Sequence, residues 1–214
     1  MSFQWKVHLE IIGVPSRFVS TFSGTEQTRR RLTAKKADVA QALVDAAVAI
    51  LRDVDYEALT IKAAAARAGV GRATAYTYFA SKNHLVAEVY WHRVAGIEPP
   101  KTKSADPSTR AVTVLCELAL LMASEPALAR AVTIAMCSSD ANAVLLRDKI
   151  GLRVHRLIAE ALADTGDSVM IDLLEDVYFG VLIYSGNAGT YSEAELCRTI
   201  ENAVLHLFGI PSAS

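Results

Sequence analysis

The stretch TIKAAAARAGVGRATAYTYFASKNHL, residues 60–85, decides the fold of this chain. It predicts two short helices joined by a glycine turn. Thr60 is a suitable cap for the first helix, because its hydroxyl can accept a hydrogen bond from a backbone N–H at the helix start. Gly69 supplies the turn, since glycine adopts a positive φ without a steric penalty. Two helices arranged in this way are typical of a helix-turn-helix unit that binds DNA.

The two predicted helices can pack closely because the first one turns small residues inward. These inward positions are Ile61, Ala64, Ala65 and Ala68. Val70 fills the angle between the helices, and the second helix is predicted from Gly71 or Arg72 to Tyr78. A helical hairpin that serves only as core is the alternative interpretation.

The second helix carries side chains that suit DNA recognition. Arg72 lies near its start, where an arginine can make a bidentate contact to O6 and N7 of a guanine in the major groove. Ala73 can approach a thymine methyl group, and Thr77 can reach a base edge or a phosphate. Thr74 is a further hydrogen-bonding side chain on this helix. We therefore predict that this helix reads bases, with Arg72 as the first candidate.

The region from Ala40 to Val89 resembles the N-terminal domain of TetR-family transcriptional regulators. The resemblance rests above all on Ala68–Gly71 and on Ala75–Leu85, which reads AYTYFASKNHL. It implies an all-α homodimer in which three small helices bind DNA and a larger C-terminal helical domain binds a small molecule. It also implies a repressor that binds a palindromic operator and is released by its effector.

The same resemblance assigns contacts to the DNA backbone. Tyr76 and Tyr78 match positions that donate hydroxyl hydrogen bonds to phosphates. Thr60 and Lys82 match two further phosphate anchors at helix starts. An aromatic residue under the first helix, here Tyr56, is expected to be core.

Two residues of the unit depart from the family pattern. Gly71 stands where a serine or another capping residue is common, so a phosphate contact from that side chain is missing. Ala75 replaces a larger apolar residue. Because of these differences, the operator sequence does not follow from the resemblance.

The residues before the first helix include a basic run, Arg29–Arg31. Immediately before a helix-turn-helix, Arg30 and Arg31 are candidates to enter the minor groove, where the negative potential attracts arginine. Residues 1–24 lack helical periodicity and make a poor signal peptide, and residues 1–28 together are taken as one extension. We expect a flexible or loosely docked extension there; the alternative is an arm that packs on the core or on a partner.

Charge is distributed unevenly along the chain, although the formal net charge is only −1. Residues 25–95 carry 11 Lys and Arg against 7 acidic residues, whereas residues 96–214 carry 9 against 15. Positive charge therefore collects in the predicted DNA-binding domain, residues 29–95, where it attracts phosphates. The remainder, residues 96–214, is predicted to be a ligand-binding and dimerisation domain.

The pattern after the helix-turn-helix predicts helices to the end of the chain. A brace helix over 36–53 and a connecting helix from 81 or 82 to 95 complete the first domain, and a proline-rich linker follows at 96–107. The C-terminal helices are predicted over 108–123, 126–136, 141–163, 168–188 and 193–208. With 52% hydrophobic residues, the chain has ample material for a core.

Apolar residues of these helices are candidates for an effector pocket and a dimer interface, with intramolecular core as the alternative at each position. Methionines adapt to varied shapes, so a hydrophobic effector is favoured over a sugar or a metal ion. Tyr178 can offer one directional hydrogen bond to it. The pocket candidates are Leu118, Leu121, Met122, Ile134, Met136, Met170, Leu174, Tyr178 and Phe179. The last two helices are expected to form a four-helix dimer interface through Tyr184, Leu196, Ile200, Val204, Leu205 and Phe208.

No motif for an enzyme, cofactor or metal site is present. The segment Gly69–Thr74 fails as a nucleotide-binding loop, and the histidines lack metal-ligand spacing. The cysteines, at 116, 137 and 197, are interpreted as small core residues in a reduced cytoplasmic compartment, with a redox sensor as the alternative. No stretch is long enough to span a membrane. Two rival functions stay open: a regulator controlled by a partner protein, and a hydrophobic-ligand carrier or enzyme.

Overall fold

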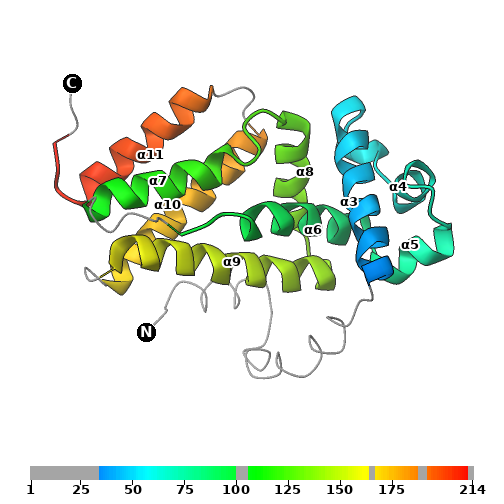
Figure 1. Cartoon of the computed structure of the whole chain (residues 1–214). Coiled ribbons are helices and arrows are strands. Elements are labelled where there is room, and N and C mark those ends of the chain that lie inside the picture. The colour runs from blue at the N-terminus through cyan, green and yellow to red at the C-terminus, as the bar shows by residue number, and fades with distance from the viewer. Residues whose placement is uncertain (1–33, 100–105, 164–166, 188–191, 212–214) are drawn as a thin grey trace.

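The computed structural model describes residues 34–99, 106–163, 167–187 and 192–211, and these residues form an all-helical chain (Figure 1). The predicted fold class is confirmed. The extension over residues 1–28 and the candidate DNA contacts Arg30 and Arg31 lie outside the described residues.

A cluster of small helices occupies one end of the molecule (Figure 1). Helix α3 packs on α4 and α6, and α4 packs on α5. Between α3 and α4 the chain makes one turn of 3₁₀ helix, η2. The bounds are α3 Ala34–Asp53, η2 Tyr56–Ala58, α4 Ile61–Arg67, α5 Arg72–Tyr78 and α6 Lys82–Ala95.

Small and aromatic residues fill the core of this cluster. Ala64 on α4 and Ala75 on α5 are fully buried, so the two short helices approach closely, as predicted for α4. Tyr56 and Leu59 are buried beneath α3, and Phe79 is buried after α5. All three positions are therefore core, which confirms the expectation for Tyr56.

Five further helices make up the rest of the described chain. Four start at side-chain caps: Asp106, Asp140, Asp167 and Ser192 each accept at least one hydrogen bond from a backbone N–H group of the first turn. The bounds are α7 Pro107–Leu120, α8 Pro126–Met136, α9 Ala141–Leu162, α10 Ser168–Asn187 and α11 Glu193–Leu207. Helix α7 ends three residues before the predicted end, because the amide of Leu121 bonds back to Leu118 in a tighter turn.

Helix α6 belongs to both parts of the molecule. It leaves the first cluster beside α3 and packs against α8 and α9 in the second part (Figure 1). On the far side, α11 lies along α7 and α10 crosses α8. The main core is one continuous cluster that runs from Leu43 to Val204. A displacement of α6 would therefore be felt in both parts.

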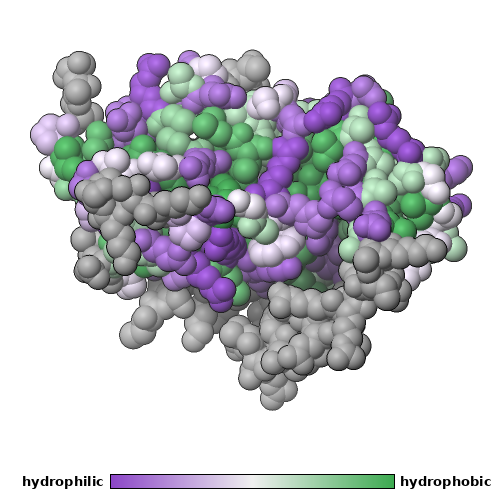
Figure 2. Space-filling model, in the orientation of Figure 1, coloured by the Kyte–Doolittle hydropathy of each residue, from purple (hydrophilic) through white to green (hydrophobic). Residues whose placement is uncertain are grey.

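Among the described residues, no helix is long and apolar enough to cross a membrane. The face of the molecule in Figure 2 mixes hydrophilic and hydrophobic residues. A docking surface has to be found from the exposed residues of individual helices.

Candidate nucleic-acid interface

The helix-turn-helix geometry predicted from residues 60–85 is present. The hydroxyl of Thr60 accepts a hydrogen bond from the amide of Ala63 at 3.0 Å and so caps α4. Gly69 has φ +66°, in the left-handed region that favours glycine. The amide of Val70 bonds to the carbonyl of Ala65 at 2.9 Å, which closes the end of α4.

Helix α5 exposes nearly all of its side chains. Only Ala75 is buried, and Tyr78 is half-buried. The Arg72 guanidinium carbon lies 5.7 Å from the centre of the Tyr76 ring, so the two long side chains share one side of the helix. The exposed candidates are Arg72, Ala73, Thr74, Tyr76 and Thr77. An exposed helix with an arginine in its first turn has the form needed to enter a major groove.

Other candidate contacts already have partners inside the protein. The Thr77 hydroxyl donates to the carbonyl of Ala73 at 3.1 Å. The Lys82 ammonium donates to the backbone carbonyl of Tyr56 at 3.1 Å, and its nitrogen lies 4.0 Å from the centre of the Tyr56 ring. The Tyr56 hydroxyl in turn donates to the Asn83 side chain. Lys82 thus holds η2 against α6, and two of its three N–H donors are left for a phosphate.

Gly71 is the N-cap of α5 and contributes no side-chain cap. A serine fits there, because a Cβ built on Gly71 meets only the Thr74 hydroxyl, at 3.6 Å. We expect Gly71→Ser to tighten DNA binding by about 3-fold to 10-fold through one added phosphate hydrogen bond. Fluorescence anisotropy with labelled DNA measures the change. Ala194→Ser, on the exposed side of α11, is the control; equal affinities for both variants would contradict the expectation.

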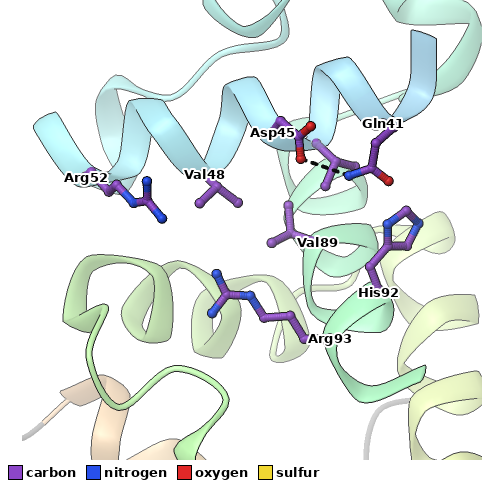
Figure 3. Close-up of a pocket in the computed structure, with 8 residues that line it drawn as sticks. Gln41, Asp45, Val48, Arg52, Val89, His92 and Arg93 are labelled. Atoms are coloured by element: carbon purple, nitrogen blue, oxygen red, sulfur yellow. Dashed lines mark hydrogen bonds between the residues drawn. The ribbon is translucent and has the colours of Figure 1, made fainter. Parts of the chain in front are cut away.

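An open cleft of about 440 Å³ lies where α3 faces α6 (Figure 3). Arg52 from α3 and Arg93 from α6 point into it from opposite sides, and Gln41 donates to Asp45 at 2.8 Å along one rim. The lining residues are Gln41, Val44, Asp45, Val48, Arg52, Val89, His92 and Arg93.

Glu125, the N-cap residue of α8, connects the two arginines of this cleft. One carboxylate oxygen lies 3.0 Å from Nη2 of Arg52, and the other accepts from Nη2 of Arg93. Arg93 also donates to the carbonyl of Leu121. Burial acts to raise the pKa of Glu125, but hydrogen bonds from Arg52 and Arg93, together with their charges, outweigh it and hold the pKa below its ordinary value. One carboxylate therefore links α3, α6 and α8.

Glu125→Gln should cost stability in a pH-dependent way. The folded-state pKa is lowered, so the stabilisation is fully present above the ordinary value of 4.5 and is lost as pH falls through the lower folded-state value. At pH 7 we expect the variant to lose about 1 to 2 kcal/mol of unfolding free energy, a figure discounted because Arg52 is exposed. Urea denaturation from pH 7 to pH 3 measures both proteins. Two results would count against the link from Glu125 to Arg52 and Arg93. One is a difference in unfolding free energy between wild type and Glu125→Gln that stays constant with pH, and the other is an equal loss of unfolding free energy in the exposed control Glu117→Gln.

The nine predicted pocket residues lie in the second part of the molecule, and none of them lines the cleft. Leu118, Met122, Leu174 and Tyr178 are buried in the core, and the other five are half-buried. The hydroxyl of Tyr178 on α10 hydrogen-bonds that of Tyr90 on α6, with both rings fully buried. Burial raises the pKa of Tyr178, so its hydroxyl stays protonated.

The prediction that α11 supplies the dimer interface is wrong for three of its residues. Leu196, Ile200 and Val204 are buried within their own protomer, where α11 packs on α7. They are core residues, the alternative that the sequence had left open. Leu205 and Phe208 are half-buried, and Tyr184 is exposed.

Helix α10 carries an apolar stripe that sequence reasoning missed except at Tyr184. Its members recur at helical spacing and are 40–59% exposed. Gly180 lies between them, with no atom within 4 Å of a Cβ built there, so another helix could approach closely. The stripe consists of Val169, Leu173, Ile183 and Tyr184. The spacing of these residues along one side of α10 was the available signal, but it was hidden because α10 is apolar on more than one side.

The cysteines are also less buried than predicted. Cys137, at the end of α8, is exposed, whereas Cys116 and Cys197 are half-buried. Within the described ranges, no group of three or more His, Cys, Asp or Glu residues is placed to hold a metal ion.

Comparison with known proteins gives consistent matches. The family described as "Bacterial regulatory proteins, tetR family" matches residues 43–89, and "Tetracyclin repressor-like, C-terminal domain" matches residues 104–207. An uncharacterised HTH-type transcriptional regulator of Mycobacterium tuberculosis is 39% identical over 153 residues, 71% of each chain. The HTH-type transcriptional repressor KstR of Rhodococcus jostii is 34% identical over 128 residues, 58% of this chain and 59% of KstR. The structure of the Bacillus subtilis regulator FadR in complex with stearoyl-CoA superposes with a TM-score of 0.55 at 16% identity, over 77% of this chain and 96% of FadR.

Proposed function

Because this chain belongs to the TetR family of helix-turn-helix transcriptional regulators, we propose that it binds a palindromic DNA operator as a homodimer and leaves it when a small apolar effector binds. The family consists of regulators and not of enzymes, which removes the enzyme alternative. A location in the cytoplasm, together with the DNA, is part of the proposal.

The exposed side of α5 is the observation that carries the proposal. Arg72 reads a guanine, Ala73 contacts a thymine methyl group, and Thr74 and Thr77 reach base edges or phosphates. The backbone anchors are Thr60, Tyr76, Tyr78 and Lys82, with Arg30 and Arg31 in the adjacent minor groove. Thr77 and Lys82 exchange part of their present hydrogen bonding for phosphate contacts.

A homodimer is proposed to form through the stripe on α10. Four exposed apolar side chains on one side of a helix make a suitable self-complementary surface when two copies meet about a two-fold axis. Leu205 and Phe208, half-buried on and just after α11, extend the surface. The dimer would present two α5 helices about 34 to 36 Å apart, the distance between successive major grooves on one side of DNA.

The effector is proposed to bind in the core of the second part, beside Tyr90 and Tyr178. Four of the predicted pocket residues lie on α10, and the other five lie on α8 or on and just after α7; all nine belong to the main core or pack against it. A ligand that takes one of the two tyrosine hydroxyls as a hydrogen-bond partner would break the link between α6 and α10. The stearoyl-CoA complex of FadR shows that a regulator of this fold binds a long acyl thioester. We propose an effector of the same apolar class.

This effector site gives a test with Tyr178→Phe. The variant should bind a long-chain acyl-CoA more weakly than wild type, by about 5-fold to 100-fold, because it lacks the hydroxyl that orients the ligand. Isothermal calorimetry with stearoyl-CoA, and with free CoA as the control ligand, measures the affinity. Two results would rule out this site: equal affinity of the variant and wild type for stearoyl-CoA, or binding of free CoA that is as tight as that of stearoyl-CoA. Circular dichroism verifies that the variant is folded.

Release from DNA is proposed to follow the movement of α6. This helix carries Tyr90 at the proposed effector site and Arg93 in the bridge to Glu125 and α3. An effector that binds better when the two α5 helices are too far apart for the operator shifts the population away from the DNA-bound form. Equal effector affinity of free and DNA-bound protein would contradict this mechanism.

The operator itself is tested with DNA from the region upstream of the gene. We expect binding that is far tighter than to random DNA of equal length at the same salt concentration. Adding stearoyl-CoA should weaken it. Sequence preference without any effect of apolar ligands would favour the second candidate, a regulator that responds to a partner protein.

A further inference from the structure

Two cysteines from distant parts of the sequence meet in the second part of the molecule. Cys116 lies on α7 and Cys197 on α11, 81 positions apart, and these helices pack side by side (Figure 1). The Cys116 thiol donates a hydrogen bond to the backbone carbonyl oxygen of Cys197, with 3.9 Å between the sulfur and the oxygen. Both residues are half-buried, so small oxidants can reach them.

The surroundings give the two thiols different roles. Burial raises the pKa of the Cys116 thiol to about 12, with further contributions from the hydrogen bond and charge of Cys197 and the charge of Glu201. Cys116 therefore remains protonated at neutral pH and is a poor nucleophile toward an oxidant. The first attack on an oxidant therefore falls to Cys197, and Cys116 attacks second.

We propose that Cys116 and Cys197 form a reversible intramolecular disulfide when the protein meets a hydroperoxide. The Cys197 thiolate attacks the peroxide, the O–O bond breaks, and a sulfenic acid forms with release of hydroxide. The Cys116 thiolate then attacks the Cys197 sulfur, the S–O bond breaks, and hydroxide leaves. In sum, two thiols and one hydrogen peroxide give one disulfide and two waters. A dithiol returns both cysteines to the reduced form.

The disulfide ties α11 to α7. A bond that closes so long a loop restricts the unfolded chain, and the oxidised protein should melt about 5 to 15 °C higher than the reduced protein. The modification does not depend on the proposed operator or effector, because its residues lie outside both sites.

Cys137 provides the matched control for the test. It is the third cysteine of the chain and exposed, so an unspecific thiol reaction would favour it. Wild type and the single variants Cys116→Ser, Cys197→Ser and Cys137→Ser are treated with one equivalent of hydrogen peroxide. Intact mass spectrometry, peptide mapping without reductant and thermal melting follow, before and after dithiothreitol.

Wild type and Cys137→Ser should each lose two hydrogen atoms, yield a peptide that links residues 116 and 197, and melt higher, all reversed by dithiothreitol. The other two variants should form no such link. Added oxygen atoms without a link in wild type, a link that uses Cys137, or disulfide-joined dimers would each overturn the proposal. If a serine variant does not fold, the alanine variant at the same position takes its place.

Discussion

Replacing Arg72 with alanine is expected to abolish preference for the operator while the fold stays intact. The side chain is exposed in the first turn of α5, so its removal leaves the core unchanged. A bidentate arginine contact to guanine discriminates by about 1 to 3 kcal/mol, and a dimer carries two of them. The operator should therefore bind about 30-fold to 10,000-fold more weakly, with affinity for random DNA falling much less. Anisotropy titrations over a range of salt concentrations measure both.

Two controls separate base reading from simple charge. Arg72→Lys keeps the positive charge but loses the planar two-pronged donor, so we expect it to keep affinity for random DNA and lose specificity. Arg198→Ala removes an exposed arginine of α11 and should change neither the affinity for random DNA nor the preference for the operator. An Arg72→Lys variant with full operator preference would mean that this residue contacts phosphate and that another side chain reads the bases.

An acidic residue at Ile183 is expected to give a folded monomer, whereas one at Val204 is expected to unfold the protein. Ile183 is 47% exposed on α10, and Val204 is fully buried beneath α11. Ile183→Asp places a charge in the proposed dimer surface, and DNA affinity should fall at least about 100-fold when the second half-site contact is lost. Val204→Asp buries an unpaired carboxylate and should cost on the order of 4 kcal/mol.

Sedimentation velocity and urea denaturation distinguish the two results. Asn202→Asp, on the exposed side of α11, adds the same charge and should alter neither assembly nor stability. A dimeric Ile183→Asp would show that the copies meet elsewhere. A Val204→Asp variant that is stable and monomeric would indicate that α11 forms the dimer interface after all.

Local signals were sufficient for most of the helices. The side chains of the caps Thr60, Asp140 and Ser192 each accept a hydrogen bond from the backbone N–H three positions later. The sequence around each cap therefore shows where its helix begins. Gly69 was predictable for the same reason, because its φ depends on the turn that it makes. The helix ends were less predictable; α7 stops early because of a local tightening at Leu121.

The sequence was a weaker guide to what the apolar side of a helix packs against. Helix α11 has a clear apolar side, and the sequence could not tell whether this side meets α7 of the same copy or a second copy. Both contacts demand the same hydrophobic residues, since burial of apolar surface does not depend on chain identity. Only the packing of α11 on α7 placed Leu196, Ile200 and Val204 in the core and left α10 to carry exposed apolar residues.

The all-helical class, the helix-turn-helix and the polar side chains of α5 follow from short stretches of sequence, because helix periodicity, caps and a glycine turn are encoded within a few residues. The tertiary structure alone decided which distant residues meet. The Glu125 bridge, the Tyr90 and Tyr178 hydroxyl pair and the contact between Cys116 and Cys197 each join residues more than 30 positions apart. No short-range pattern records such pairs, because they arise when whole helices bury their apolar sides against one another.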